Sequence, residues 1–154
     1  MSLPYENATS GDKAIADIEK LLRGFGCKSF GSMMQYDTGE RLVQFEYRGR
    51  QVSVKASARG YAVAWLKQHP YKASGYGKTK VSEVKHNERA MSIGTIAVCS
   101  ILRDWIKGQI TAVETGILTF EGAFLGQLLL ASGRTVLDEV QHQALLPAPK
   151  EKTA

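Results

Sequence analysis

Cysteine is scarce in this chain, and long apolar runs are missing. Two cysteines in 154 residues, Cys27 and Cys99, are too few for a disulfide scaffold and indicate a reducing compartment. No stretch approaches the roughly 20 consecutive apolar residues that cross a bilayer. Residues 1–25 also lack the basic-then-apolar order of a signal peptide. With 44% apolar residues, the composition predicts a single cytoplasmic domain with its own core and no contact with membranes.

Acidic residues are absent from one long window, residues 47–82. Eight basic residues lie in it: Arg48, Arg50, Lys55, Arg59, Lys67, Lys72, Lys78 and Lys80. The wider region 41–89 has 11 basic and 3 acidic residues, a net charge of +8, whereas the whole chain carries +5. This segregation predicts a surface that binds a polyanion. A solvated loop that needs charge for solubility is the alternative.

The N-terminal half predicts a helix followed by a three-stranded antiparallel meander. Apolar residues from Ala14 to Phe25 follow helical spacing, with Thr9 or Ser10 as the cap and glycines at the end. Strands are expected over 27–36, 41–47 and 50–56, separated by turns at 37–40 and 48–49. A short helix over 61–68, which Ser57 could cap, follows them.

The C-terminal half predicts helices. A long helix extends from Ser82 to Thr115, and apolar residues cover more than half its circumference, so it lies in the core or at an oligomer interface within 83–115. Two shorter helices are expected over 120–131 and from Thr135 to Ala144. The fold class is therefore α+β. We expect a flexible leader (1–8), a single domain (9–146) with a basic loop at 67–82, and a disordered tail (147–154).

No catalytic or metal-binding pattern is convincing. Residues 75–79 contain Gly-Lys-Thr, but Lys72 stands where a phosphate-binding loop needs its first glycine. Asp37 and Glu46 could hold Mg²⁺ for a nuclease, although a turn and a strand surface explain them better. The histidines at 69, 86 and 142 are far apart, and neither cysteine has a second ligand nearby. We therefore expect a protein that is not an enzyme and that needs no cofactor or metal.

A motif in the C-terminal half resembles a known family. It comprises Trp105-Ile106-Lys107, Ala112-Val113-Glu114, Gly116-Ile117, Phe120-Glu121, Phe124-Leu125 and Gly133-Arg134-Thr135-Val136. The order is similar to that of small, uncharacterised phage and prophage early-region proteins. The resemblance implies a protein that acts inside a bacterial host, but it implies no activity. It does not extend over 56–88, where family members are shorter. The matched residues are typical of packing and capping rather than of an active site.

The functional prediction is a nucleic-acid-binding accessory protein that uses region 41–89 on single- or double-stranded DNA. The predicted contact residues are Arg48, Arg50, Lys55, Lys67, Tyr71, Lys72, Tyr76, Lys78 and Lys80. Lysines would neutralise phosphates, and Tyr71 and Tyr76 would stack on unpaired bases. One alternative is a module that binds an acidic or nucleoprotein host complex, for example an anti-defence inhibitor. Another is an oligomeric scaffold assembled through the long helix.

Overall fold

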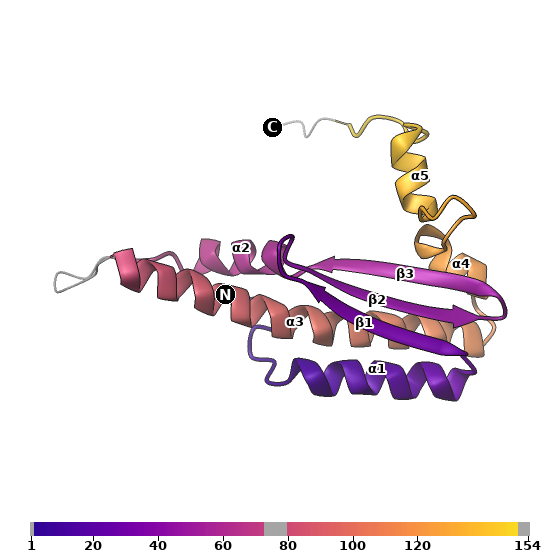
Figure 1. Cartoon of the computed structure of the whole chain (residues 1–154), viewed down its shortest axis with the longest axis horizontal. Coiled ribbons are helices and arrows are strands. Elements are labelled where there is room, and N and C mark those ends of the chain that lie inside the picture. Colours follow the sequence, from indigo (N-terminus) through magenta and orange to yellow (C-terminus); the bar gives the residue numbers. More distant parts are fainter. Residues whose placement is uncertain (1, 73–79, 151–154) are drawn as a thin grey trace.

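The structure is a computed structural model that describes residues 2–72 and 80–150, without the side chains of Lys80 and Val81. Its elements are α1 (Gly11–Phe25), β1 (Ser29–Gln35), β2 (Glu40–Tyr47), β3 (Arg50–Ser57), α2 (Ala58–Gln68), α3 (Lys80–Glu114), α4 (Phe120–Phe124), the 3₁₀ turn η1 (Leu125–Gln127) and α5 (Val136–His142) (Figure 1). This order confirms the predicted α+β fold. None of the described helices is both long and apolar enough to cross a membrane.

The three strands form one antiparallel sheet in the order β1-β2-β3. The turn between β2 and β3 consists of Arg48 and Gly49, whose φ angles are 48° and 78°. Two positive φ angles define a tight hairpin turn whose twist matches that of the strands. The predicted hairpin is therefore confirmed, and Val43 lies beside Val54 in its register.

The described helices cover one face of the sheet. Val43, Phe45 and Val52 point to this inner face and are at most 2% exposed. They pack against α1 and α3 in a core that also includes Ile18, Leu22, Leu102, Ile106, Ile110, Phe120, Phe124 and Leu128. In Figure 1, α3 passes behind the sheet and no described helix crosses in front of the strands. The other face, called the outer face below, is therefore open to solvent.

Helix α2 lies unusually close to α3. Small residues meet there, because Ala58 and Ala62 of α2 and Ala90 of α3 are all buried. At Gly94 of α3 even one added carbon would overlap the backbone oxygen of Ala58. Trp65 is buried beside them, in a second apolar cluster. This crossing fixes α2 beyond the end of β3.

The predicted helix over 120–131 is wrong beyond Phe124. After α4 the chain makes one 3₁₀ turn, and Leu128 then pairs with Val52 of β3. The backbone N–H of Leu129 donates to the oxygen of Gln51 at 2.8 Å. The segment therefore forms hydrogen bonds with the edge of β3 instead of continuing as a helix. Leu125, the first residue after α4, is consequently 55% exposed.

The last helix, α5, begins as predicted. The side-chain oxygen of Thr135 accepts a hydrogen bond from the backbone N–H of Asp138 at 3.1 Å. No residue of α5 is buried, and Figure 1 shows the helix standing away from the sheet. The segment after α4 also carries exposed leucines, at positions 125, 130, 137, 145 and 146.

Candidate nucleic-acid interface

Strand β3 continues into α2 without a loop. Ser57 ends β3 and also caps α2, because its side-chain oxygen accepts a hydrogen bond from the backbone N–H of Gly60 at 2.8 Å. The two elements lie end to end along one side of the molecule (Figure 1). Eight strand residues and eleven helical residues together span about 40 Å. Both elements belong to the acid-free window, so we call residues 48–72 the basic edge.

The predicted cations lie along this edge, all of them exposed. Arg48 and Arg50 are at the hairpin end of the sheet, Lys55 is in β3, Lys67 is in α2 and Lys72 follows it. The structure thus arranges them in a line rather than in a compact patch. Lys67 is helical and α3 already begins at Lys80, so the predicted loop boundaries of 67 and 82 are wrong. Helix α2 ends at Gln68, where the helix predicted over 61–68 also ends, whereas α3 begins two residues before the predicted Ser82.

Most cations of the basic edge have no acidic partner in the part of the chain that the structure describes. Arg50 is the exception, since its Nε lies 3.1 Å from Oε1 of Glu121, with both side chains about half exposed. Arg48 places its guanidinium 5.2 Å from the ring centre of Tyr47. Lys55, Lys67 and Lys72 pair with no carboxylate among the described residues. These three lysines are therefore available to a polyanion.

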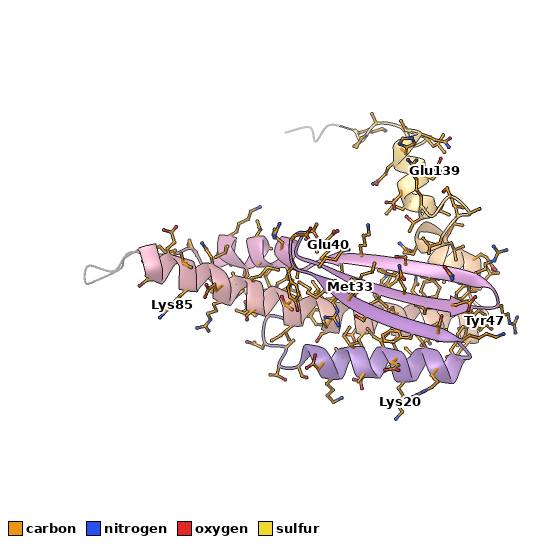
Figure 2. The ribbon with its side chains drawn as sticks, in the orientation of Figure 1. Lys20, Met33, Glu40, Tyr47, Lys85 and Glu139 are labelled. Carbon is orange, nitrogen blue, oxygen red and sulfur yellow. The ribbon has the colours of Figure 1, made fainter. Side chains whose placement is uncertain are left out.

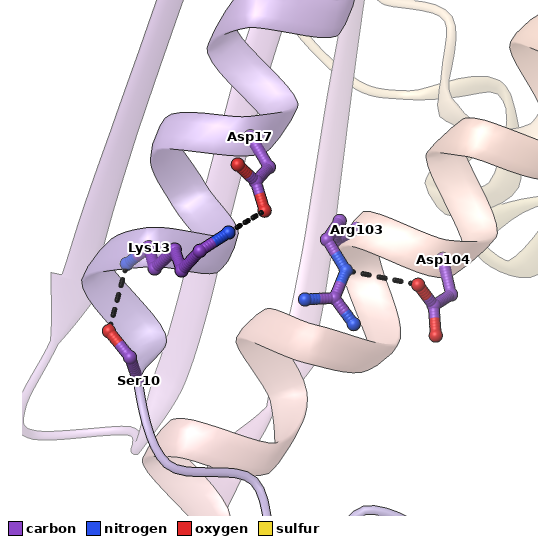
Figure 3. A network of polar contacts seen from close by, with 5 residues as sticks. All are labelled: Ser10, Lys13, Asp17, Arg103 and Asp104. Atoms are coloured by element: carbon purple, nitrogen blue, oxygen red, sulfur yellow. Dashed lines mark hydrogen bonds and ion pairs between the residues drawn. The ribbon is translucent and has the colours of Figure 1, made fainter.

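The solvent side of the helical layer contains cations that are paired with nearby carboxylates. In Figure 3, Lys13 pairs with Asp17 at 3.2 Å, and the Nε of Arg103 lies 3.0 Å from Oδ1 of Asp104. The hydroxyl of Tyr5 also donates to Asp104 at 2.6 Å, and together with Arg103 it holds the pKa of that carboxyl below its usual range. Two cations on this side, Lys13 and Arg103, thus have a carboxylate partner.

The turn between β1 and β2 is held against the start of α2 by Arg59. Its backbone N–H donates to the oxygen of Gly39, and its guanidinium donates to the oxygen of Asp37, each at 3.1 Å. Gly39 has a φ of +70°, and a side-chain carbon there would come within 2.9 Å of Cβ of Arg59. Tyr36, which precedes Asp37, is 86% exposed. This tyrosine therefore lies on a well-supported turn beside the junction of β3 and α2, in the middle of the basic edge.

The outer face contains a shallow hollow of about 260 Å³. Gly31 lies in the middle of β1 and contributes no side chain, so nothing at this position covers the side-chain amides of Gln44 and Gln51. The lining residues are Ser29, Phe30, Gly31, Gln44, Phe45, Gln51, Val52 and Leu129. Gln44 donates a side-chain hydrogen bond to Ser53 at 3.3 Å, whereas the Gln51 amide has no hydrogen-bond partner among the described side chains. The hollow thus combines polar and apolar residues, and Gln51 is exposed in it.

The remaining predicted contact residues are only partly described. Tyr71 is half-buried, and its ring centre lies 5.9 Å from that of His86. Tyr76 and Lys78 lie outside the described residues, as does the side chain of Lys80. Sequence reasoning missed Tyr36 and Gly31. An aromatic residue before Asp-Thr-Gly and a glycine within a strand are visible signals, but their meaning depends on which face of the sheet is uncovered.

The other chemical patterns are not assembled into sites. Asp37 and Glu46 lie at opposite ends of β2, about 20 Å apart along the strand. His69 and His86 pack on Trp65, and the oxygen of His69 accepts a hydrogen bond from Nε2 of His86 at 2.6 Å. Within 2–72 and 80–150, no three His, Cys, Asp or Glu side chains form a group able to hold a metal ion. Burial raises the pKa of the Cys27 thiol to about 11.

Comparisons of the chain with models of protein families, with curated proteins and with solved structures gave no match.

Proposed function

We propose that this chain is a non-enzymatic, phage-type accessory protein that binds nucleic acid along the basic edge inside a bacterial host cell. One observation supports this most: on the basic edge, Lys55, Lys67 and Lys72 are exposed and have no acidic partner among the described residues. Each lysine that neutralises a phosphate releases condensed counterions, which supplies affinity without sequence specificity. An edge of about 40 Å is long enough to follow several phosphates.

Fluorescence anisotropy with labelled oligonucleotides at several salt concentrations tests the proposal. In the edge variant, Lys55, Lys67 and Lys72 are replaced by glutamine. Its slope of log affinity against log salt should be shallower by about 2 to 3, because each lost phosphate contact removes roughly 0.7 to 0.9. The matched control replaces Lys20, Arg23 and Lys107 of the helical layer, which are equally exposed and lose the same charge.

Two results would contradict this proposal. One is the absence of wild-type binding to single- or double-stranded DNA at micromolar protein and low salt. The other is an equal loss of salt dependence in the edge variant and in its control, because charge alone would then explain the effect.

A protein-binding function, such as inhibition of a host defence complex, is favoured by a different observation. The segment after α4 exposes five leucines, among them Leu145 and Leu146 at 62% and 67%. Recovery of the same host protein from lysate with and without nuclease treatment would support this alternative, and loss of Leu145 and Leu146 should abolish that recovery. Assembly through α3 has less support, because the buried side chains of α3 already pack against α1, α2 and the sheet of the same chain.

A further inference from the structure

We propose that single-stranded nucleic acid binds across the outer face of the sheet and the adjoining β1–β2 turn, with one unpaired base in the hollow over Gly31 and another base stacked on Tyr36 in that turn. This inference rests on the proposed function and specifies its ligand. The basic edge by itself would attract single and double strands alike, because phosphate contacts carry no information about base pairing. The outer face adds groups that only unpaired bases can reach.

The hollow suits a single ring system. At about 260 Å³ it is smaller than the roughly 300–1,000 Å³ of pockets that enclose a drug-sized ligand. Its floor offers the Gln44 and Gln51 amides, which both donate and accept hydrogen bonds, as the edges of bases require. Leu129 closes one side with an apolar surface. Bases in a duplex have these edges paired and these faces stacked, so they cannot enter.

Charge around the hollow orients such a strand. Glu46 lies beside Ser29 and Gln51 in the cross-strand register, so its carboxylate disfavours a phosphate directly over the hollow, whereas Arg48 and Arg50 lie at the adjoining hairpin. Carboxylates do accept hydrogen bonds from the amino groups of bases. Lys55 lies beside Leu42 on the same face, farther toward α2, and can hold a phosphate there. The strand would therefore place its backbone toward the basic edge and its bases over β1 and β2.

Tyr36 provides a second contact, about 17 Å from Gly31 along the chain direction. Arg59 anchors its turn, and Met33, 54% exposed, lies on the outer face between the two positions (Figure 2). An exposed aromatic ring beside a cationic edge is the arrangement by which proteins stack unpaired bases without sequence preference. Asp37 and Glu40 adjoin the tyrosine and disfavour phosphates there, so the contact is to a base.

Gly31→Leu tests the hollow directly. A side-chain carbon at Gly31 would meet no atom within 4 Å, and its φ is not in the left-handed region, so the fold accepts the change. The leucine would occupy the space assigned to the base. We expect affinity for a 20-nucleotide poly-dT strand to fall at least about tenfold, with affinity for a hairpin duplex of equal length unchanged. Gly108→Leu is the matched control, since Gly108 of α3 is exposed and equally unobstructed.

Tyr36→Ala is the second variant, and it does not touch the core. Loss of one stacked base should weaken poly-dT binding by about 5- to 150-fold, whereas Tyr36→Phe should keep it. Equal affinity of the wild type for strand and duplex would overturn the inference, as would unchanged poly-dT binding by both Gly31→Leu and Tyr36→Ala. In either case a response of the edge variant would leave the proposed function standing. If the wild type binds neither probe, the proposed function itself fails.

Discussion

Replacing Gly94 by alanine tests the helix crossing on which the basic edge depends. The added carbon would overlap the backbone oxygen of Ala58, and it would also lie 3.1 Å from the backbone nitrogen of Ala62. Because backbone atoms cannot rotate aside, α2 must move away from α3 and lose its contacts around Trp65. Overpacking of this kind costs about 3 kcal/mol at the upper end of its range. Alanine regains about 1 kcal/mol of helix propensity, so the net loss is about 2 kcal/mol.

The assay is thermal and urea unfolding followed by circular dichroism. For a domain of about 150 residues, a loss of 2 kcal/mol lowers Tm by about 4–8 °C. Gly108→Ala is the matched control in the same helix, since nothing lies within 4 Å of its added carbon. It should gain about 1 kcal/mol, so the two substitutions should shift Tm in opposite directions. A Gly94→Ala protein as stable as the wild type would refute the close crossing of α2 and α3.

Two further predictions concern the core and a thiol. Phe124 is fully buried, and its ring centre lies 5.4 Å from that of Phe45 and 5.7 Å from that of Trp105, so Phe124→Ala should cost about 3–5 kcal/mol in urea unfolding. The exposed neighbour provides the control, because Leu125→Ala should change stability by less than about 0.5 kcal/mol, and similar losses at the two positions would contradict the observed end of α4. With its pKa raised from 9.0 to about 11, the Cys27 thiol should react with iodoacetamide at pH 8 about 100-fold more slowly in the folded chain than in urea. Equal rates would show that the thiol is not shielded from solvent.

Local patterns predict the elements whose hydrogen bonds are local. The α1 helix satisfies this condition: Ser10 accepts from the backbone N–H of Lys13 at 3.1 Å, and Gly26 ends the helix with a φ of 109°. The β2–β3 hairpin does so too, because Arg48-Gly49 can adopt the positive φ angles of its turn. In each case the residues that decide the structure lie within a few positions of one another.

In the segment after α4, the structure is not decided by neighbouring residues. Its leucines have helical spacing, but Leu128 bonds to β3, which is more than 70 positions earlier in the chain. A local pattern contains no information about such a partner. The motif that resembles the phage family contains residues that the sequence pattern places correctly and residues that it does not. Phe120 and Phe124 pack in the core and Thr135 caps α5, as expected, whereas Ile117 is 75% exposed.

At the candidate site, the charges in the sequence predict the class of ligand but not the geometry of the surface. The acid-free window is visible in the sequence, and it is the reason to expect a polyanion. That window would attract phosphates equally well as a mobile loop or as a rigid edge. The difference arises at Ser57, which joins β3 to α2 directly, and at Arg59, which fastens a distant turn to the same place. In the interface that we propose, rigid spacing of cations beside an uncovered sheet face allows selection between paired and unpaired bases, so we expect selectivity for single strands to depend on these two residues more than on the number of lysines.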